Sequence, residues 1–265
     1  MTADWPGLSD KVCVITGGLG GLGRAMAHAF LGAGAKVLLL DRPPQDPASA
    51  MAEFAASGNR CRFAPVDVGD TGSVAAAFEG CADQLGAPHV LVNNAAMSAS
   101  APLADLDLAA WELQMSVNVG GYLRCAQAFR RHRDTSAAGA IVNIASIAGH
   151  NAQPGSGGYS MGKAAIAMLT RQLALEWGPE NIRTNSVSPG LFITPLSEQF
   201  YRNPDDRARR EAVVPLRRIG DPAELADAVV YLSSPRASYV NGAEIVVDGG
   251  FSDTLMAHIP RAYGA

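Results

Sequence analysis

The chain has 265 residues, of which 48% are hydrophobic and 17% are charged, and its formal net charge is −4. This composition is typical of a globular protein rather than a disordered one, and the length suffices for one large α/β domain with a sizeable core. A mildly acidic chain gives no electrostatic reason to expect binding to nucleic acid or to an anionic membrane.

The sequence also argues against a secreted protein, a membrane protein or a metalloprotein. Residues 1–11 lack the basic and apolar regions of a secretory signal, and no stretch approaches the ~20 apolar residues of a membrane span. The cysteines lie too far apart for a redox pair or a zinc site, and Cys13 is expected to be a buried free thiol. The five histidines show no metal-ligand spacing. We therefore expect a cytoplasmic protein without a bound metal.

Short apolar runs alternate with helix-length segments along the chain. The runs are rich in Val, Ile and Leu with little polar alternation, which is typical of strands covered on both faces. The predicted strands are 11–16, 35–41, 61–68, 89–94, 139–146, 182–188 and 243–250. The predicted helices are 22–32, 71–85, 107–131, 159–177 and 222–233, the last with Asp221 as N-cap and Pro222 at its first position. This alternation predicts an α/β, Rossmann-like, doubly wound parallel sheet of about seven strands in a single domain, 1–265.

Three segments break the alternation. Residues 41–47 form a Pro-rich loop that is too short to divide the chain. Residues 190–218 form a long insertion, which we interpret as a substrate-binding lid, a solvated helical excursion being the alternative. Residues 251–265 form a C-terminal tail that either reaches a neighbouring subunit or is a frayed terminus.

A glycine-rich turn, residues 16–23, follows the first predicted strand and opens the first predicted helix. It can be read as G-x-G-x-x-G on Gly18, Gly20 and Gly23, or as T-G-x-x-x-G-x-G on Gly17, Gly21 and Gly23. In either register, glycines let a pyrophosphate approach backbone N–H groups at a helix N-terminus. The turn therefore predicts a bound dinucleotide.

Asp41 ends the second predicted strand, at about the ~20-residue distance where a carboxylate reaches the adenosine ribose. A carboxylate there repels a 2′-phosphate, so we expect NAD rather than NADP. Arg42, next to it, leaves NADP open because a guanidinium can accept that phosphate.

Tyr159 and Lys163 lie four residues apart at the start of a predicted helix, where they share one face. A free tyrosine has a pKa near ~10, and a nearby cation lowers it towards the range useful for general base catalysis. Ser146 ends the predicted strand 139–146, and strand C-termini face the ligand crevice in a doubly wound sheet. A Tyr-x-x-x-Lys pair alone is most often a surface pair, so Ser146 adds weight to the interpretation.

These motifs, together with "NNAA" at 93–96, Asn118 and "SPG" at 188–190, occur in an order that resembles the short-chain dehydrogenase/reductase family. The resemblance covers almost the whole chain and favours the register Gly17, Gly21 and Gly23. One departure is visible: the motif usually written N-N-A-G ends here in Ala96, which adds a methyl group and removes no functional group.

The resemblance implies a catalytic role for four residues. Tyr159 is the acid/base, and Lys163 lowers its pKa and binds the nicotinamide ribose. Ser146 orients the substrate oxygen, and Asn118 holds a water in a proton relay. The hydride itself passes between the nicotinamide and the substrate carbon.

The resemblance also implies cofactor contacts, with Asp67 and Val68 at the adenine, Ile193 and Thr194 at the carboxamide, and Asn93 bracing the sheet. The implied cofactor-binding residues are Gly17, Gly21, Leu22, Gly23, Asp41, Asp67, Val68, Asn94, Ala95, Tyr159, Lys163, Pro189, Gly190, Ile193 and Thr194.

Substrate contacts are predicted from the segments 97–102, 147–157 and 190–200, which are mostly small or apolar. The candidates are Ser98, His150, Gln153 and Leu191, with an exposed loop position as the alternative for His150 and Gln153. Few fixed charges there favour a neutral sugar, polyol or cyclic alcohol over a carboxylate.

Other functions remain open from the sequence. The basic runs 207–210 and 217–218 fit an NADPH-dependent 3-oxoacyl-thioester reductase of the same family, although Asp41 argues against it. A dinucleotide-binding regulatory protein without turnover is a remote alternative. A serine hydrolase is disfavoured because Ser146 lacks the flanking glycines of G-x-S-x-G. The family resemblance suggests a homotetramer, with helices 107–131 and 159–177 packing between subunits.

Overall fold

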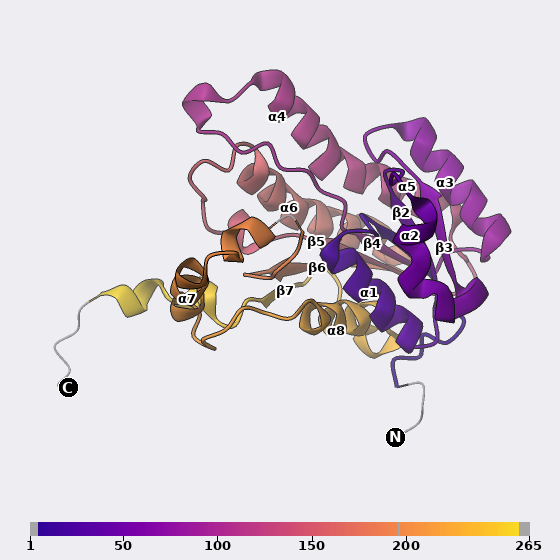
Figure 1. Cartoon of the computed structure of the whole chain (residues 1–265). Coiled ribbons are helices and arrows are strands. Elements are labelled where there is room, and N and C mark those ends of the chain that lie inside the picture. Colours follow the sequence, from indigo (N-terminus) through magenta and orange to yellow (C-terminus); the bar gives the residue numbers. More distant parts are fainter. Residues whose placement is uncertain (1–4, 196, 260–265) are drawn as a thin grey trace.

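One parallel sheet organises the molecule, as the computed structural model of residues 5–195 and 197–259 shows (Figure 1). The strands lie in the order β3-β2-β1-β4-β5-β6-β7, so the winding direction reverses between β1 and β4. They are β1 Val12–Thr16, β2 Lys36–Asp41, β3 Cys61–Pro65, β4 Val90–Asn93, β5 Gly139–Ile144, β6 Ile182–Pro189 and β7 Glu244–Val247. The predicted Rossmann-like α/β fold is confirmed, and each strand falls in its predicted run, with β6 one residue longer.

Helices cover both faces of the sheet. One face packs on α1 and α8 through side chains such as Phe30 and Leu225, and the other packs on α3, α5 and α6 through Phe78, Phe129 and Leu173. The helices are α1 Gly21–Gly32, α2 Pro47–Met51, α3 Thr71–Gln84, α4 Leu108–Met115, α5 Gly121–His132, α6 Tyr159–Trp177, α7 Pro204–Val213 and α8 Pro222–Ser233. Because the strands are buried on both faces, their apolar residues are continuous rather than alternating.

Local capping explains several helix boundaries. Asp221 caps α8 in a capping box with Glu224, and Pro222 occupies the first helical position, as predicted. Asp46 caps α2 by accepting from the N–H groups of Ala48 and Ser49. The Pro-rich stretch 41–47 is therefore a loop that leads into a short helix absent from the prediction.

The helix predicted over 107–131 differs from the structure in one respect. The chain is helical throughout, but a π-helical turn, Ser116–Gly120, separates α4 from α5. The N–H of Gly121 donates to the carbonyl of Ser116, five residues back. The extra residue in this turn turns Asn118 inward, where it is fully buried.

The insertion 190–218 and the tail adopt structure of their own. The insertion contains a 3₁₀ turn, Glu198–Tyr201, and the helix α7, which Figure 1 places on the same side as the C-terminus. The tail contains two 3₁₀ turns, Phe251–Asp253 and Leu255–His258, while residues 260–265 lie outside the described part of the chain.

Candidate active site

The glycine turn after β1 has the geometry of the second register. Gly17 has a positive φ of 62°, and a Cβ on Gly21 would lie 2.9 Å from Pro195 Cδ. A Cβ on Gly23 would overlap the main-chain carbonyl oxygen of Gly17. At Gly20, by contrast, the nearest atom to a Cβ is 3.3 Å away. Gly23 belongs to both registers, and a Cβ on Gly18 would lie 2.9 Å from Leu39, so Gly20 is the position that separates the registers. The room at Gly20 favours the register Gly17, Gly21 and Gly23, as the sequence did.

The N-terminus of α1 is free to receive a phosphate. Its N-cap is Gly20, which provides no side-chain cap, and no acidic residue lies in its first turn. The N–H groups of a first helical turn have no intrahelical acceptors and carry the positive end of the helix dipole. A pyrophosphate fits this uncapped start.

Neighbouring main-chain and amide groups fix the turn against β4. Asn94 Nδ2 donates to the carbonyls of Thr16 and Gly17, both at 3.0 Å, and its own N–H donates to Thr16 Oγ1 at 2.9 Å. The Asn94 side chain thus holds the phosphate-binding turn in place. Asn93, one residue earlier, bonds to Tyr122 O and Asn143 Oδ1, which joins β4 to α5 and β5.

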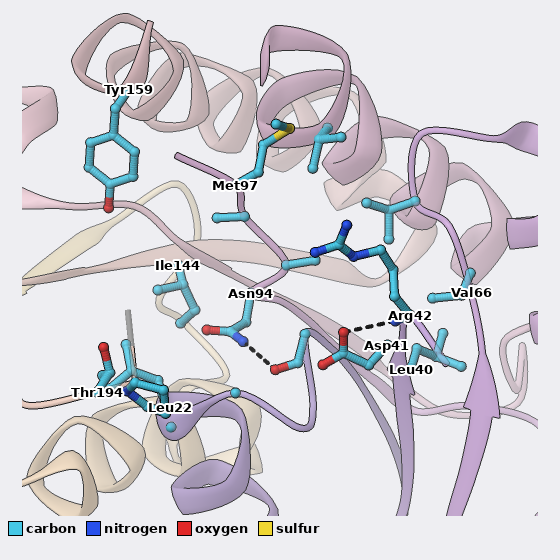
Figure 2. A pocket seen from close by; sticks show the side chains of 18 of the residues that line it. Leu22, Leu40, Asp41, Arg42, Val66, Asn94, Met97, Ile144, Tyr159 and Thr194 are labelled. Atoms are coloured by element: carbon cyan, nitrogen blue, oxygen red, sulfur yellow. Dashed lines mark hydrogen bonds between the residues drawn. The ribbon is translucent and has the colours of Figure 1, made fainter. Parts of the chain in front are cut away.

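Asp41 lies at the adenosine end of the site. Its Oδ2 accepts from Leu19 N at 2.9 Å, and its Oδ1 accepts from Arg42 N at 2.8 Å. Two main-chain donors therefore orient the carboxylate at the end of β2. Figure 2 shows the Arg42 side chain extending beside it along the same wall.

One pocket of about 650 Å³ joins this end to Tyr159 and Lys163 (Figure 2). The other two predicted catalytic residues, Ser146 and Asn118, are not part of its lining. A volume of this size is typical of a cofactor site. Twelve of the predicted cofactor residues line it: Gly17, Gly21, Leu22, Asp41, Asp67, Val68, Asn94, Ala95, Tyr159, Lys163, Pro189 and Thr194.

The Tyr159 hydroxyl points into the far end of this pocket (Figure 2). Its side chain is hydrogen-bonded to that of Ser146, which is buried in the loop just after β5, at the N-cap of the 3₁₀ turn Ile147–Gly149. Ser146 Oγ accepts from Ala148 N at 3.1 Å, so its proton remains available to a second oxygen. Burial raises the pKa of Tyr159, and the Ser146 hydrogen bond opposes that rise.

The Lys163 side chain is buried next to the Tyr159 ring. Its Nζ donates to the Ile144 carbonyl at 2.7 Å and to Tyr122 Oη at 3.3 Å, and lies 5.7 Å from the centre of the Tyr159 ring. Burial lowers the pKa of Lys163 to about 7. In the chain without its cofactor, burial raises the pKa of Tyr159, where a lowered pKa was expected, and the contact that opposes the rise is Ser146 rather than Lys163.

Asn118 is held by the segment that follows β4. Its Oδ1 accepts from Met97 N at 2.8 Å, and its Nδ2 donates to Met97 O at 2.9 Å. Both ends of the side chain are engaged in this pair. This pair uses one Nδ2 hydrogen and one Oδ1 lone pair, so it orients the buried amide of Asn118 against Met97.

Comparison with known proteins agrees with this geometry. Residues 17–252 match the family model described as enoyl-(acyl carrier protein) reductase. A cis-4-hydroxycyclohexanecarboxylate dehydrogenase of Sinomonas cyclohexanicum is 37% identical, covering 92% of this chain and 97% of the relative. A D-threitol dehydrogenase of Mycolicibacterium smegmatis is 32% identical, covering 92% of this chain and 94% of the relative.

A solved structure extends the similarity to three dimensions. A gluconate 5-dehydrogenase from Burkholderia cenocepacia, in complex with NADP and tartrate, is 31% identical with a TM-score of 0.86, covering 93% of this chain and 96% of that chain. The chain belongs to the short-chain dehydrogenase/reductase family. As a member of that family it is an oxidoreductase acting on CH–OH groups, with a nicotinamide dinucleotide as cofactor.

Some predicted residues of this short-chain dehydrogenase/reductase lie outside the pocket lining. Gly23 lies behind the turn, packed on Gly17 and Gly18, and Gly190 lies against Asp248. Ile193 is half-buried and does not line the pocket. None of these three residues is part of the pocket lining.

The predicted substrate residues are dispersed. Ser98 is exposed and bonded to Ser100 Oγ at 3.0 Å, and Gln153 is exposed. His150 Nε2 lies 2.7 Å from Glu244 Oε1 rather than in the pocket. Leu191 lines a separate hollow of about 90 Å³ beneath the insertion. The structure does not bring these four together.

Several pocket residues were absent from the prediction, because apolar positions carry no motif. They are Gly20, Leu40, Arg42, Val66, Ala96, Met97, Leu113, Val117, Ile144, Ala145 and Pro195. The sequence analysis discussed Gly20, Arg42 and Ala96, and its substrate segments 97–102 and 190–200 include Met97 and Pro195. A signal existed for Val66, since it directly precedes the predicted adenine contact Asp67.

Within 5–195 and 197–259, no three His, Cys, Asp or Glu side chains gather as a metal site would require. In the same ranges, no helix is both long and apolar enough to cross a membrane. All four cysteines are free and buried, Cys13 among them, as expected for that residue.

Proposed function

We propose that this enzyme is an NAD-dependent dehydrogenase that oxidises a neutral secondary alcohol, such as a cyclic alcohol or a polyol, to its ketone. The observation that carries the proposal is one continuous pocket with a carboxylate, Asp41, at one end and the hydroxyl of Tyr159, hydrogen-bonded to Ser146, at the other. When bound, the dinucleotide supplies a nicotinamide C4 that accepts the hydride.

The chain's own residues supply the acid–base chemistry. Tyr159 Oη takes the hydroxyl proton of the substrate in the oxidative direction and returns it in the reverse direction. Ser146 Oγ, whose acceptor side is engaged with Ala148 N, donates a hydrogen bond to the same substrate oxygen. Lys163 is held by Ile144 O and Tyr122 Oη, with its ammonium close to the phenol it would stabilise.

The choice of NAD rests on Asp41. Its carboxylate is oriented by two main-chain N–H groups, so it cannot easily turn away from a 2′-phosphate. Arg42 remains the feature that favours NADP, and a structural relative was solved with NADP. We weigh the oriented carboxylate more heavily.

A neutral substrate follows from the charges around the catalytic end. The one basic side chain in the loop 147–157 is His150, and its imidazole is paired with Glu244. A substrate carboxylate would find no free cation in that loop. Among the named relatives, the threitol dehydrogenase supports a neutral polyol. The hydroxycyclohexanecarboxylate dehydrogenase supports a cyclic alcohol, but its substrate carries a carboxylate, so it does not support a neutral one.

The alternative 3-oxoacyl-thioester reductase draws on the basic runs 207–210 and 217–218. In the structure these arginines have partners within the chain: Arg207 pairs with Glu211, Arg218 pairs with Glu224, and Arg210 stacks on Phe200 and Tyr201. The carboxylate partners of Arg207 and Arg218 balance part of the positive charge of this surface, which reduces its attraction for an acidic carrier protein. This favours the dehydrogenase.

We further propose that residues 1–265 work as one domain in a cytoplasmic homotetramer, with 190–218 as the substrate lid. Support for association comes from the predicted contact helices, which carry exposed apolar side chains such as Leu108, Met168 and Leu175. The tail 251–259 also exposes Leu255 and Met256, which would suit contact with a neighbouring subunit.

The testing experiment measures NADH formation across neutral sugars, polyols, cyclic alcohols and hydroxy acids. We expect turnover of a neutral alcohol that is lost in Tyr159→Phe and retained in Tyr239→Phe, a control at a fully exposed tyrosine. Good turnover of hydroxy acids with none of neutral alcohols would overturn the substrate class. Activity only with ketones and NADPH would favour the reductase, and dinucleotide binding with no turnover would favour the regulatory protein.

A further inference from the structure

Gln114, on α4, has a fully buried polar side chain with no role in the catalytic mechanism described above. Its Oε1 accepts from Gly158 N at 2.9 Å, and its Nε2 donates to Met97 O at 3.3 Å. A buried amide with both ends bonded to main-chain groups of two other segments fixes the distance between those segments.

The first of these segments is the start of the catalytic helix. Gly158 is the N-cap of α6, which begins at Tyr159, and as a glycine it provides no side-chain cap. Helix starts normally depend on such a side chain to hold their free N–H groups. Here the contact that fixes the helix start comes from another helix, through Gln114.

The second segment, at Met97, forms a wall of the pocket. Met97 is already bonded through both its N and its O to the side chain of Asn118, which lies four residues after Gln114 on the same helical stretch. Gln114 and Asn118 together therefore clamp Met97 and, through Gly158, tie it to Tyr159.

Packing at Gly158 leaves little room for movement. A Cβ there would lie 2.7 Å from Trp111 Cδ1 and 2.8 Å from Gln114 Oε1. The neighbouring Gly157 N donates to Ala101 O at 3.2 Å, so the 97–101 segment and the start of α6 run side by side. Gln114 lies at the centre of this junction.

We propose that Gln114 is a positioning residue, which sets the place of the Tyr159 hydroxyl relative to the Met97 wall of the pocket. The inference rests on the proposed function, in which Tyr159 moves the substrate proton. Without the Gln114 bridge, the first turn of α6 can shift away from the 97–101 segment. A displacement of about 1 Å in such a group reduces the rate by about 100-fold.

The test compares Gln114→Met, Thr170→Val and Gln114→Glu by NMR of protein carrying carbon-13 at the ring Cζ of tyrosine. The Tyr159 signal is identified by its loss in Tyr159→Phe. Gln114→Met keeps the side-chain length and removes both hydrogen bonds. Thr170→Val is the matched control, because Thr170 is equally buried on α6 and accepts from Asn143 Nδ2 at 2.9 Å. We expect Gln114→Met to shift the Tyr159 signal and Thr170→Val to leave it in place, with both proteins folded.

The third variant, Gln114→Glu, adds a pH signature. Its neutral carboxyl can accept from Gly158 N and donate to Met97 O, whereas its carboxylate can only accept and repels the Met97 carbonyl. Burial raises the pKa of such a carboxyl. As the pH falls through that pKa, the Tyr159 signal should return to its wild-type position, which a purely structural loss would not show.

Kinetics provide the second arm. In Gln114→Met we expect kcat to fall by about 100-fold, while the Kd of NAD⁺ stays within about twofold because Gln114 is not part of the pocket lining. A Tyr159 signal unmoved in Gln114→Met, or moved equally by Thr170→Val, would overturn the proposal. If the wild type turns over no alcohol, the proposed function fails, and the NMR series still decides the role of Gln114.

Discussion

Individual residues of this enzyme act through contacts that set their charge and direction. Asp41 shows this at the cofactor end, where donors from Leu19 and Arg42 hold the carboxylate. Lys163 and Tyr159 show it at the catalytic end, where burial shifts both pKa values towards the neutral forms. Each effect can be measured with a single substitution.

Asp41→Asn removes the charge that excludes a 2′-phosphate and keeps most of the side-chain shape. We expect the ratio of NADP⁺ affinity to NAD⁺ affinity to rise by about tenfold or more, because like charges placed together cost several kcal/mol. Titration of both dinucleotides measures this ratio. Asp46→Asn, which removes the same charge from the N-cap of α2, is the control and should leave the ratio unchanged. An unchanged ratio in both variants would mean that Asp41 does not select the cofactor.

The buried Lys163 predicts a pH dependence of stability. Its pKa is about 7 in the folded chain and 10.5 when unperturbed, so unfolding takes up a proton between these values. The free energy of unfolding should therefore rise with pH, by up to about 1.4 kcal/mol per unit. Below about pH 7 the group is protonated in both states, and its contribution is constant. Above about pH 10 the raised pKa of Tyr159 acts in the opposite direction, so the useful range ends there.

The measurement is denaturant unfolding of the dinucleotide-free wild type and of Lys163→Met between pH 7 and pH 10. We expect the difference in unfolding free energy to change with pH in favour of the wild type, because the methionine variant lacks the titrating group. Other titrating groups are shared by the two proteins and cancel in the difference. A difference that is flat over this range would show that Lys163 keeps its ordinary pKa.

At the level of elements, the glycine turn between β1 and α1 depends on a few close approaches. Gly23→Ala places a methyl group against the main-chain carbonyl of Gly17, which cannot move without breaking the turn. We expect a loss of about 3 kcal/mol in unfolding free energy and no detectable binding of NAD⁺. In Gly20→Ala, the new Cβ would lie 3.3 Å from its nearest neighbour, Gly17 O. We expect this variant to lose about 1 kcal/mol of unfolding free energy, as is usual for alanine at an N-cap.

Gly23 belongs to both registers of this turn and Gly20 only to the first, so Gly20→Ala is the variant that separates them in thermal unfolding and dinucleotide titration. Equal damage from the two substitutions would contradict the register built on Gly17, Gly21 and Gly23.

The strands were predictable from the sequence because buried parallel strands are uninterrupted apolar runs, and the candidate site was predictable where chemistry needs a particular side chain. The π-helical turn at 116–120 was not, since one extra residue does not disturb a helical pattern. Gln114 was not either, because its partners, Met97 O and Gly158 N, are main-chain groups that leave no mark in the sequence. The pKa of Tyr159 required the depth of burial, which a four-residue spacing cannot give.

At the scale of the whole molecule, α6 links the catalytic site to a surface suited to association. Its buried side carries Lys163, while its outer side exposes Met161, Met168 and Leu175 by 44%, 54% and 81%. These three positions are seven residues apart, so they form one apolar stripe along the helix, the spacing by which helices pack against each other. In a homotetramer, the stripe would pack against a second copy of the chain.

Met168→Glu places a charge at the centre of this stripe. If α6 packs between subunits, we expect the variant to form a smaller assembly than the wild type in light scattering after size-exclusion chromatography, because a desolvated carboxylate without a partner opposes the contact. Val213→Glu, at an exposed apolar position on α7, is the control. Leu255→Glu tests separately whether the tail contributes. A wild type that is monomeric, or a Met168→Glu variant that assembles like the wild type, would exclude the α6 stripe as the interface and remove the support that Met168 and Leu175 give to a homotetramer.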